Sequence, residues 1–220
     1  MSLKAELEEF KAQFLAKFPA EKAAIMARAD AELATKQIEQ SALKVGDKAP
    51  SFTLPDATGK SVSLADTLKN GPTIVIFYRG GWCPYCNLEL RAYQRLLPEI
   101  QKAGGQLIAI SPQSPDSSMS TSEKNALAYP VLSDTKTDVA KGFGVLFTLP
   151  DYLQKLYADL GNDLPGINSA GAWTLPVPAT FVIGTDGTVL ARHVDTNYRV
   201  RMEPQDALDA IIKARGQHAA

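Results

Sequence analysis

Two cysteines three residues apart have the clearest capacity for chemistry in this sequence. Cys83 and Cys86 are the only cysteines among 220 residues, and they lie in the segment Gly80-Gly81-Trp82-Cys83-Pro84-Tyr85-Cys86. The run before this segment, Thr73 to Tyr78, is apolar and β-branched, which is typical of a buried central strand. The residues that follow predict a helix over 83–102. We therefore expect both thiols in the first turn of a helix that follows a strand.

This position would activate Cys83. Free backbone N–H groups and the positive end of the helix dipole stabilise a thiolate there. A cysteine pKa of about 8.5 leaves only a few per cent of thiolate at pH 7, so a lowered pKa would make Cys83 a nucleophile. Cys86, one turn further on, is expected about 5–6 Å away on the same face, within reach of a disulfide. We interpret Cys83 as the attacking thiol and Cys86 as the resolving thiol.

Three other kinds of cysteine site fit the sequence less well. The Cys-x-x-Cys spacing also occurs in zinc sites and among buried structural thiols, but zinc needs further ligands. The only histidines, His193 and His218, are far from the cysteines in sequence. A cysteine hydrolase would need an oriented histidine, and neither has an obvious partner. Redox chemistry is favoured, and we expect no metal and no cofactor.

The composition is that of an ordinary globular protein. Lys and Arg number 23 against 24 Asp and Glu, so the net charge of −1 gives no reason to expect nucleic acid or an anionic membrane as a partner. No segment approaches the roughly 18 consecutive apolar residues of a membrane span. The first ten residues lack the basic start and apolar run of a secretory signal. We expect a cytoplasmic protein with reduced thiols.

Residues 1–44 predict an N-terminal helical extension. They contain no Gly and a single Pro, Pro19, which predicts a break between two helices. Apolar residues recur at steps of three or four and form one helical stripe: Leu3, Leu7, Phe10, Phe14 and Phe18. This stripe must pack on the main body or on another subunit. A homodimer through the stripe is one hypothesis.

Residues 45–215 predict an α/β domain. The strand at 73–78, the helix at 83–102 and a second buried strand at 106–110 form a β-α-β unit. Segment 145–177 is irregular and reads as an insertion with a helix over 152–160. The remaining expected elements are a hairpin within 52–64, a polar loop over 111–122, a helix over 123–129, a strand at 131–132, a helix over 138–143, a hairpin of 180–183 with 189–192, and a final helix over 204–213.

Several segments together resemble the thioredoxin superfamily, and within it the peroxiredoxin branch of alkyl hydroperoxide reductases, thiol-specific antioxidants and bacterioferritin comigratory proteins. The resemblance implies a thioredoxin-like fold, with a central mixed sheet flanked by helices. It rests on these segments: Val45 to Phe52, Phe77-Tyr78-Arg79-Gly80, the Trp82-Cys83-Pro84-Tyr85-Cys86 motif, Ile110 to Ser114, Val131 to Asp134, and Pro178 to Ile183.

The resemblance implies a peroxide reductase. Peroxide would oxidise Cys83 to a sulfenic acid, Cys86 would resolve it as a disulfide, and a thioredoxin- or glutathione-type donor would reduce that disulfide. Arginine beside the thiolate is part of this chemistry, and Arg79 and Arg201 are the candidates.

Two further residues are expected at the site. Pro178 resembles the cis-proline that faces the cysteines in thioredoxin folds, and Trp82 would shield the thiol.

One departure leaves three functions open. Typical peroxiredoxins carry Pro-x-x-x-Thr-x-x-Cys, in which the Thr positions the peroxide, whereas Ile76 and Gly80 stand at those places here. The local motif is thioredoxin-like instead. Besides a thiol peroxidase, the sequence therefore allows a thiol-disulfide oxidoreductase acting on protein disulfides. It also allows a redox sensor whose N-terminal helices bind a partner.

Overall fold

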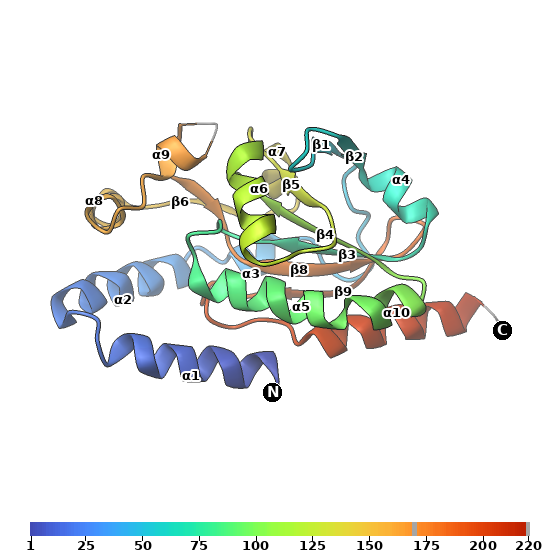
Figure 1. Cartoon of the computed structure of the whole chain (residues 1–220), viewed down its shortest axis with the longest axis horizontal. Coiled ribbons are helices and arrows are strands. Elements are labelled where there is room, and N and C mark those ends of the chain that lie inside the picture. The colour runs from blue at the N-terminus through green and yellow to red at the C-terminus, as the bar shows by residue number, and fades with distance from the viewer. Residues whose placement is uncertain (169–170, 219–220) are drawn as a thin grey trace.

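The computed structural model describes residues 1–168 and 171–218, and its central sheet lies between groups of helices (Figure 1). The helices are α1 (Leu3–Leu15), α2 (Ala20–Ala34), α3 (Ile38–Ser41), α4 (Leu64–Lys69), α5 (Pro84–Lys102), α6 (Pro115–Lys124), α7 (Asp138–Gly142), α8 (Asp151–Asp159), α9 (Leu164–Ile167) and α10 (Pro204–His218). The strands are β1 (Thr53–Pro55), β2 (Ser61–Ser63), β3 (Thr73–Phe77), β4 (Gln106–Ser111), β5 (Val131–Ser133), β6 (Leu146–Thr148), β7 (Thr174–Pro176), β8 (Ala179–Ile183) and β9 (Val189–Val194).

The central sheet is mixed, as the thioredoxin-like resemblance implied. Its strand order is β5-β4-β3-β8-β9. β3 pairs in parallel with β4, and β4 with β5, whereas β8 runs antiparallel to both β3 and β9. The predicted β-α-β unit is confirmed as β3-α5-β4. It places the start of α5 directly after the end of the central strand β3, which carries the cysteines to that edge of the sheet.

Strand β3 divides its side chains between two cores because successive residues of a strand point to opposite faces. Ile74 and Ile76 pack in the core that contains α1, α5 and α10. Val75 and Phe77 pack in the core on the other face with Phe143. All five residues of β3 are buried, so the continuous apolar run of the sequence reflects burial on both faces.

The N-terminal stripe packs on the main body. Leu3 and Leu7 of α1 are buried in the core that contains α5, and the ring of Phe10 lies edge-on to Tyr85 at 5.0 Å between centroids. Figure 1 shows α1 running alongside α5, and α2 close to α8. Leu3 and Leu7 are thus buried within one chain, whereas Phe10, Phe14 and Phe18 are half-buried.

Five sequence-based expectations about elements were wrong in detail. The segment 111–122 was expected as a loop, but most of it belongs to α6, which also takes the place of the helix expected over 123–129. α6 begins this early because the Ser114 side chain caps its N-terminus by accepting a hydrogen bond from the Ser117 N–H. Pro115 then fits the first turn of α6. Segment 145–177, of which 169–170 lie outside the described residues, contains the β6–β7 strand pair as well as α8. The extension holds a third helix, α3, and α10 continues to His218.

Across the described part of the chain, the model contains no helix with the length and apolar character that a membrane crossing requires.

Candidate active site

The two thiols meet at the N-terminus of α5. Cys83 is the N-cap residue, with extended backbone, and its carbonyl accepts the first helical hydrogen bond from the Asn87 N–H. Pro84 occupies the first turn, as the sequence predicted. The Sγ atoms of Cys83 and Cys86 are 2.8 Å apart with the Cys86 thiol donating, and both residues are free and fully buried. The pair is therefore close enough to form a disulfide with little movement of the backbone.

Arg79 supplies positive charge to Cys83. Its Nη2 lies 3.3 Å from the Cys83 Sγ, and its Nη1 donates to the hydroxyl of Tyr157 at 3.0 Å. Burial by itself raises the pKa of the Cys83 thiol, but the hydrogen bond from Cys86 and the charges of Arg79 and Arg201 outweigh it and hold that pKa well below its ordinary value. The surroundings of the buried Cys83 therefore favour its thiolate form.

The second thiol is in the opposite state. Burial, followed by the hydrogen bond to Cys83 and the charge on that sulfur, raises the pKa of the Cys86 thiol well above its ordinary value. The two pKa shifts have opposite directions, so the surroundings favour the thiolate at Cys83 and the thiol at Cys86.

Arg201 is distant from the two cysteines in the sequence, but its side chain reaches them in the fold. Its Nη2 lies 3.7 Å from the Cys86 Sγ, and its Nε donates to Glu89 Oε2 at 2.7 Å. The remaining nitrogen, Nη1, bonds to the carbonyls of Tyr198 and Val200. Both side chains of the ion pair are almost fully buried. Burial raises the pKa of Glu89, and the adjacent guanidinium opposes that rise.

Aromatic rings enclose Arg79. Its guanidinium carbon lies 3.9 Å from the ring centroid of Tyr198 and 5.1 Å from that of Trp82. The Trp82 ring in turn lies edge-on to Tyr157 at 5.4 Å. Cation–π contacts of this kind hold the guanidinium in a dry environment, where its effect on a neighbouring charge is strongest. Trp82 therefore sits beside the arginine that contacts the thiolate.

Gly80, which stands where typical peroxiredoxins have Thr, cannot carry a side chain in this structure. Its φ of +148° is unfavourable for other residues, and a Cβ atom added there would lie 2.3 Å from the indole Nε1 of Trp82. The glycine and the tryptophan therefore belong together. The space that a Thr side chain would fill is taken by the indole ring.

Pro178 lies near this region, but its peptide bond was predicted incorrectly. It lines a cavity together with Arg79, Tyr157 and Tyr198. The sequence predicted a cis bond, whereas the described peptide bonds are all trans. The chain runs from β7 to β8 without a turn, and Val177 is fixed by a hydrogen bond to the Val145 carbonyl, so the intrinsically favoured trans form fits.

The structure thus brings together Arg79, Trp82, Cys83, Cys86 and Arg201. Arg199, two residues before Arg201, pairs with Asp30 of α2 at 2.6 Å and so joins the extension to the main body.

Sequence reasoning missed Glu89, Tyr157 and Tyr198. Glu89 carried a signal, because an acidic residue three positions after Cys86 lies on the buried face of the helix. The two tyrosines carried none, since they reach Arg79 from distant loops and helices.

Comparison with known proteins agrees with this geometry. Residues 45–192 match the model of the AhpC/TSA family. A putative peroxiredoxin of Mycobacterium tuberculosis is 31% identical over 148 residues, which cover 67% of this chain and 83% of that protein. Peroxiredoxin Bcp of Escherichia coli is 35% identical over 103 residues, 47% of this chain and 65% of Bcp. The crystal structure of peroxidoxin BcpB from Mycobacterium tuberculosis superimposes with a TM-score of 0.61 at 26% identity, covering 77% of this chain and 96% of that one.

Proposed function

Because the chain belongs to the AhpC/TSA family of peroxiredoxin-type thiol peroxidases, we propose that it reduces hydrogen peroxide or organic hydroperoxides through Cys83 and Cys86. The observation that carries this proposal is the short distance from the Cys83 sulfur to both Arg79 and Cys86, at 3.3 and 2.8 Å. A guanidinium beside a thiolate can hydrogen-bond the peroxide oxygens while it keeps the sulfur charged.

The proposed cycle has three steps. The Cys83 thiolate attacks the terminal oxygen of the peroxide, the O–O bond breaks, and the departing alkoxide or hydroxide takes a proton to leave as alcohol or water. The Cys86 thiol then condenses with the Cys83 sulfenic acid, which forms the disulfide and releases water. Two thiols of a thioredoxin- or glutathione-type donor reduce the disulfide by exchange. Arg79 and Arg201 would stabilise charge in the first step, while Trp82 and Pro178 shape the surroundings.

The competing function is disulfide exchange with protein substrates, for which both sulfurs would have to reach the surface. Full burial of Cys83 and Cys86 favours a small oxidant over a protein disulfide. The need for a thiol donor in every cycle suits the cytoplasmic location that the sequence predicted.

Treatment of the reduced protein with sub-stoichiometric hydrogen peroxide tests the proposal. Mass spectrometry should show a Cys83–Cys86 disulfide within seconds, and Cys86→Ser should instead accumulate a Cys83 sulfenic acid that dimedone traps. Cys83→Ser should consume peroxide no faster than free cysteine. Peroxide consumption by Cys83→Ser at the parent rate would eliminate the proposal. Acceleration of insulin reduction by dithiothreitol, without peroxide turnover, would support disulfide exchange instead. Light scattering of the same samples would test the homodimer hypothesis.

A further inference from the structure

An irregular loop carries two of the residues that surround the thiols. It comprises residues 195–203, between β9 and α10, and we call it the arginine loop. The ring centroid of its Tyr198 lies 3.9 Å from the guanidinium carbon of Arg79. The Nη2 of its Arg201 lies 3.7 Å from the Cys86 Sγ. Because this segment lies outside the helix and strand ladders, its position depends on contacts with other parts of the chain.

The first helix of the N-terminal extension binds the end of the arginine loop. The Glu203 carboxylate accepts hydrogen bonds from the backbone N–H groups of Leu3 at 3.1 Å and Lys4 at 2.7 Å. These groups belong to the first turn of α1, where free N–H groups and the helix dipole favour a negative charge. The loop thus caps α1, and α1 in turn holds the last residue of the loop.

The other two helices of the extension bind the rest of the loop through carboxylates of their own. Asp30 of α2 pairs with Arg199 at 2.6 Å. One oxygen of Glu39, in α3, accepts hydrogen bonds from both the backbone N–H and the hydroxyl of Thr196, at 2.8 and 2.7 Å. Hydrogen bonds to ionised groups are the stronger kind. Each helix of the extension therefore makes a charge-assisted contact with the same loop.

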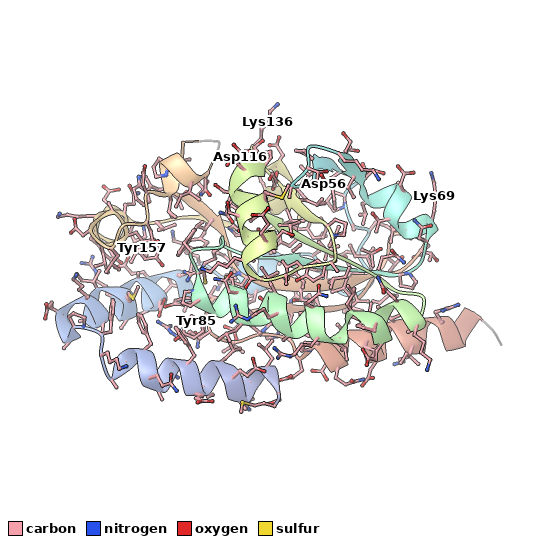
Figure 2. The ribbon with its side chains drawn as sticks, in the orientation of Figure 1. Asp56, Lys69, Tyr85, Asp116, Lys136 and Tyr157 are labelled. Carbon is pink, nitrogen blue, oxygen red and sulfur yellow. The ribbon has the colours of Figure 1, made fainter. Side chains whose placement is uncertain are left out.

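An aromatic contact joins the loop to α1 and to the cysteine-bearing helix. Tyr85 lies at the start of α5 on the side that faces α1 (Figure 2). Its ring is edge-on to Phe10 of α1, at 5.0 Å between centroids, and to Tyr198 of the loop, at 5.5 Å. The arginine loop is therefore packed between the extension and the surroundings of the thiols.

We propose that the N-terminal helices hold the arginine loop in the geometry that the reaction at the thiols needs. This inference rests on the proposed peroxidase function. Asp30 and Glu39 are positioning residues, because the loop that they bind places Arg201 beside Cys86. When these carboxylates are lost, the charge of Arg201 moves away from the sulfurs and the thiolate loses part of its stabilisation. Both residues precede the segment 45–192 that matches the AhpC/TSA family.

The test removes two carboxylates that bind the loop and compares them with one that does not. In Asp30→Asn/Glu39→Gln, the second-order rate constant with hydrogen peroxide should fall by about 10-fold or more, since small displacements near reacting atoms have effects of this size. Glu6→Gln is the matched control, because Glu6 of α1 pairs with Arg95 of α5 and so joins the extension to the main body outside the loop. It should leave the rate constant unchanged. Asp30→Glu, which keeps the charge, should react faster than Asp30→Asn.

A thiol titration separates positioning from charge. The loss of two negative charges would by itself lower the pKa of the Cys83 thiol, whereas displacement of Arg201 would raise it. The thiolate absorbance of the folded double variant should therefore appear at higher pH than in the parent. Hydrogen exchange of residues 195–203, followed by mass spectrometry, should become faster in the double variant and stay at the parent rate in Glu6→Gln.

Single variants keep the proposal testable if the double variant does not fold. Asp30→Asn and Glu39→Gln should each show the same directions of change against the same control. A folded variant with the rate constant and titration of the parent would overturn the inference while peroxidase function stands. An equal decrease in Glu6→Gln would also overturn it, because the effect would then not depend on the loop. Absence of peroxide turnover in the parent would instead refute the proposed function, and the titration and exchange would still decide the inference.

Discussion

Replacing Arg79 by Gln should remove most of what makes Cys83 reactive. The guanidinium Nη2 lies 3.3 Å from the sulfur, and neither residue is accessible enough for water to screen the contact. At this distance two unit charges attract by about 5 kcal/mol if the effective dielectric constant is about 20. Because the guanidinium charge is spread over three nitrogens and Arg201 remains, we expect about half of that energy to be lost, roughly 2–3 kcal/mol.

This energy corresponds to a decrease of about 30- to 150-fold in the equilibrium constant for thiolate formation. Burial raises the pKa of Cys83, but the Cys86 hydrogen bond and the charges of Arg79 and Arg201 hold it well below its ordinary value. This pKa should therefore rise in Arg79→Gln. The ultraviolet absorbance of the thiolate, recorded against pH, measures this directly. The second-order rate with hydrogen peroxide at neutral pH should fall with it.

Two controls separate charge from packing. Arg79→Lys keeps the charge and should retain a thiolate at neutral pH. Arg95→Gln removes an arginine of α5 whose side chain is 53% exposed, and should leave the titration unchanged. If the titration curve of folded Arg79→Gln coincides with that of the parent, the low pKa comes from the Cys86 thiol and the helix N-terminus, and our assignment to Arg79 is wrong.

Three further predictions concern stability. Glu89→Gln leaves the Arg201 charge buried without its partner, so urea unfolding should show a loss of about 3–5 kcal/mol; a loss below 1 kcal/mol would mean that water reaches the pair. Leu7→Ala should cost about 2–5 kcal/mol if α1 packs in the core of its own chain, whereas the exposed Leu15→Ala should change little; equal effects would contradict that packing. The lowered pKa of Cys83 in the folded state means that the unfolded chain binds more protons between the folded and unfolded pKa values. The free energy of unfolding of the reduced parent, relative to Cys83→Ser, should therefore rise with pH across that window and lose this advantage as pH falls through the folded pKa; a difference independent of pH would contradict the assignment.

The tertiary structure also explains why this site lacks the usual Thr. In the sequence, Gly80 is only a departure from the peroxiredoxin pattern. In the fold, its positive φ and the indole ring of Trp82 exclude any side chain at that position. A peroxide bound beside Cys83 would therefore meet Arg79 in place of a Thr hydroxyl.

Local signals in the sequence were enough to predict that Cys83 and Cys86 lie one turn apart at the start of a helix, within the β3-α5-β4 unit that positions them. A strand pattern, a proline suited to a first helical turn and two cysteines one turn apart are properties of adjacent residues, and local geometry follows from them. Ser114 and Pro115 were equally local signals for the start of α6, but the polar composition of that segment led us to expect a loop.

The surroundings of the thiols depended on contacts between distant segments. Glu89 and Arg201 are 112 residues apart in the chain, and Arg79 and Tyr157 are 78 apart, yet both pairs are hydrogen-bonded in the interior. Such pairs form only when the sheet order brings their elements together, and no periodicity in the sequence records that order. The stripe from Leu3 to Phe18 also combines a local and a distant property. Its spacing predicted an apolar helix face. Only the packing of α1 on α5 decided that this face contacts the cysteine-bearing helix of its own chain.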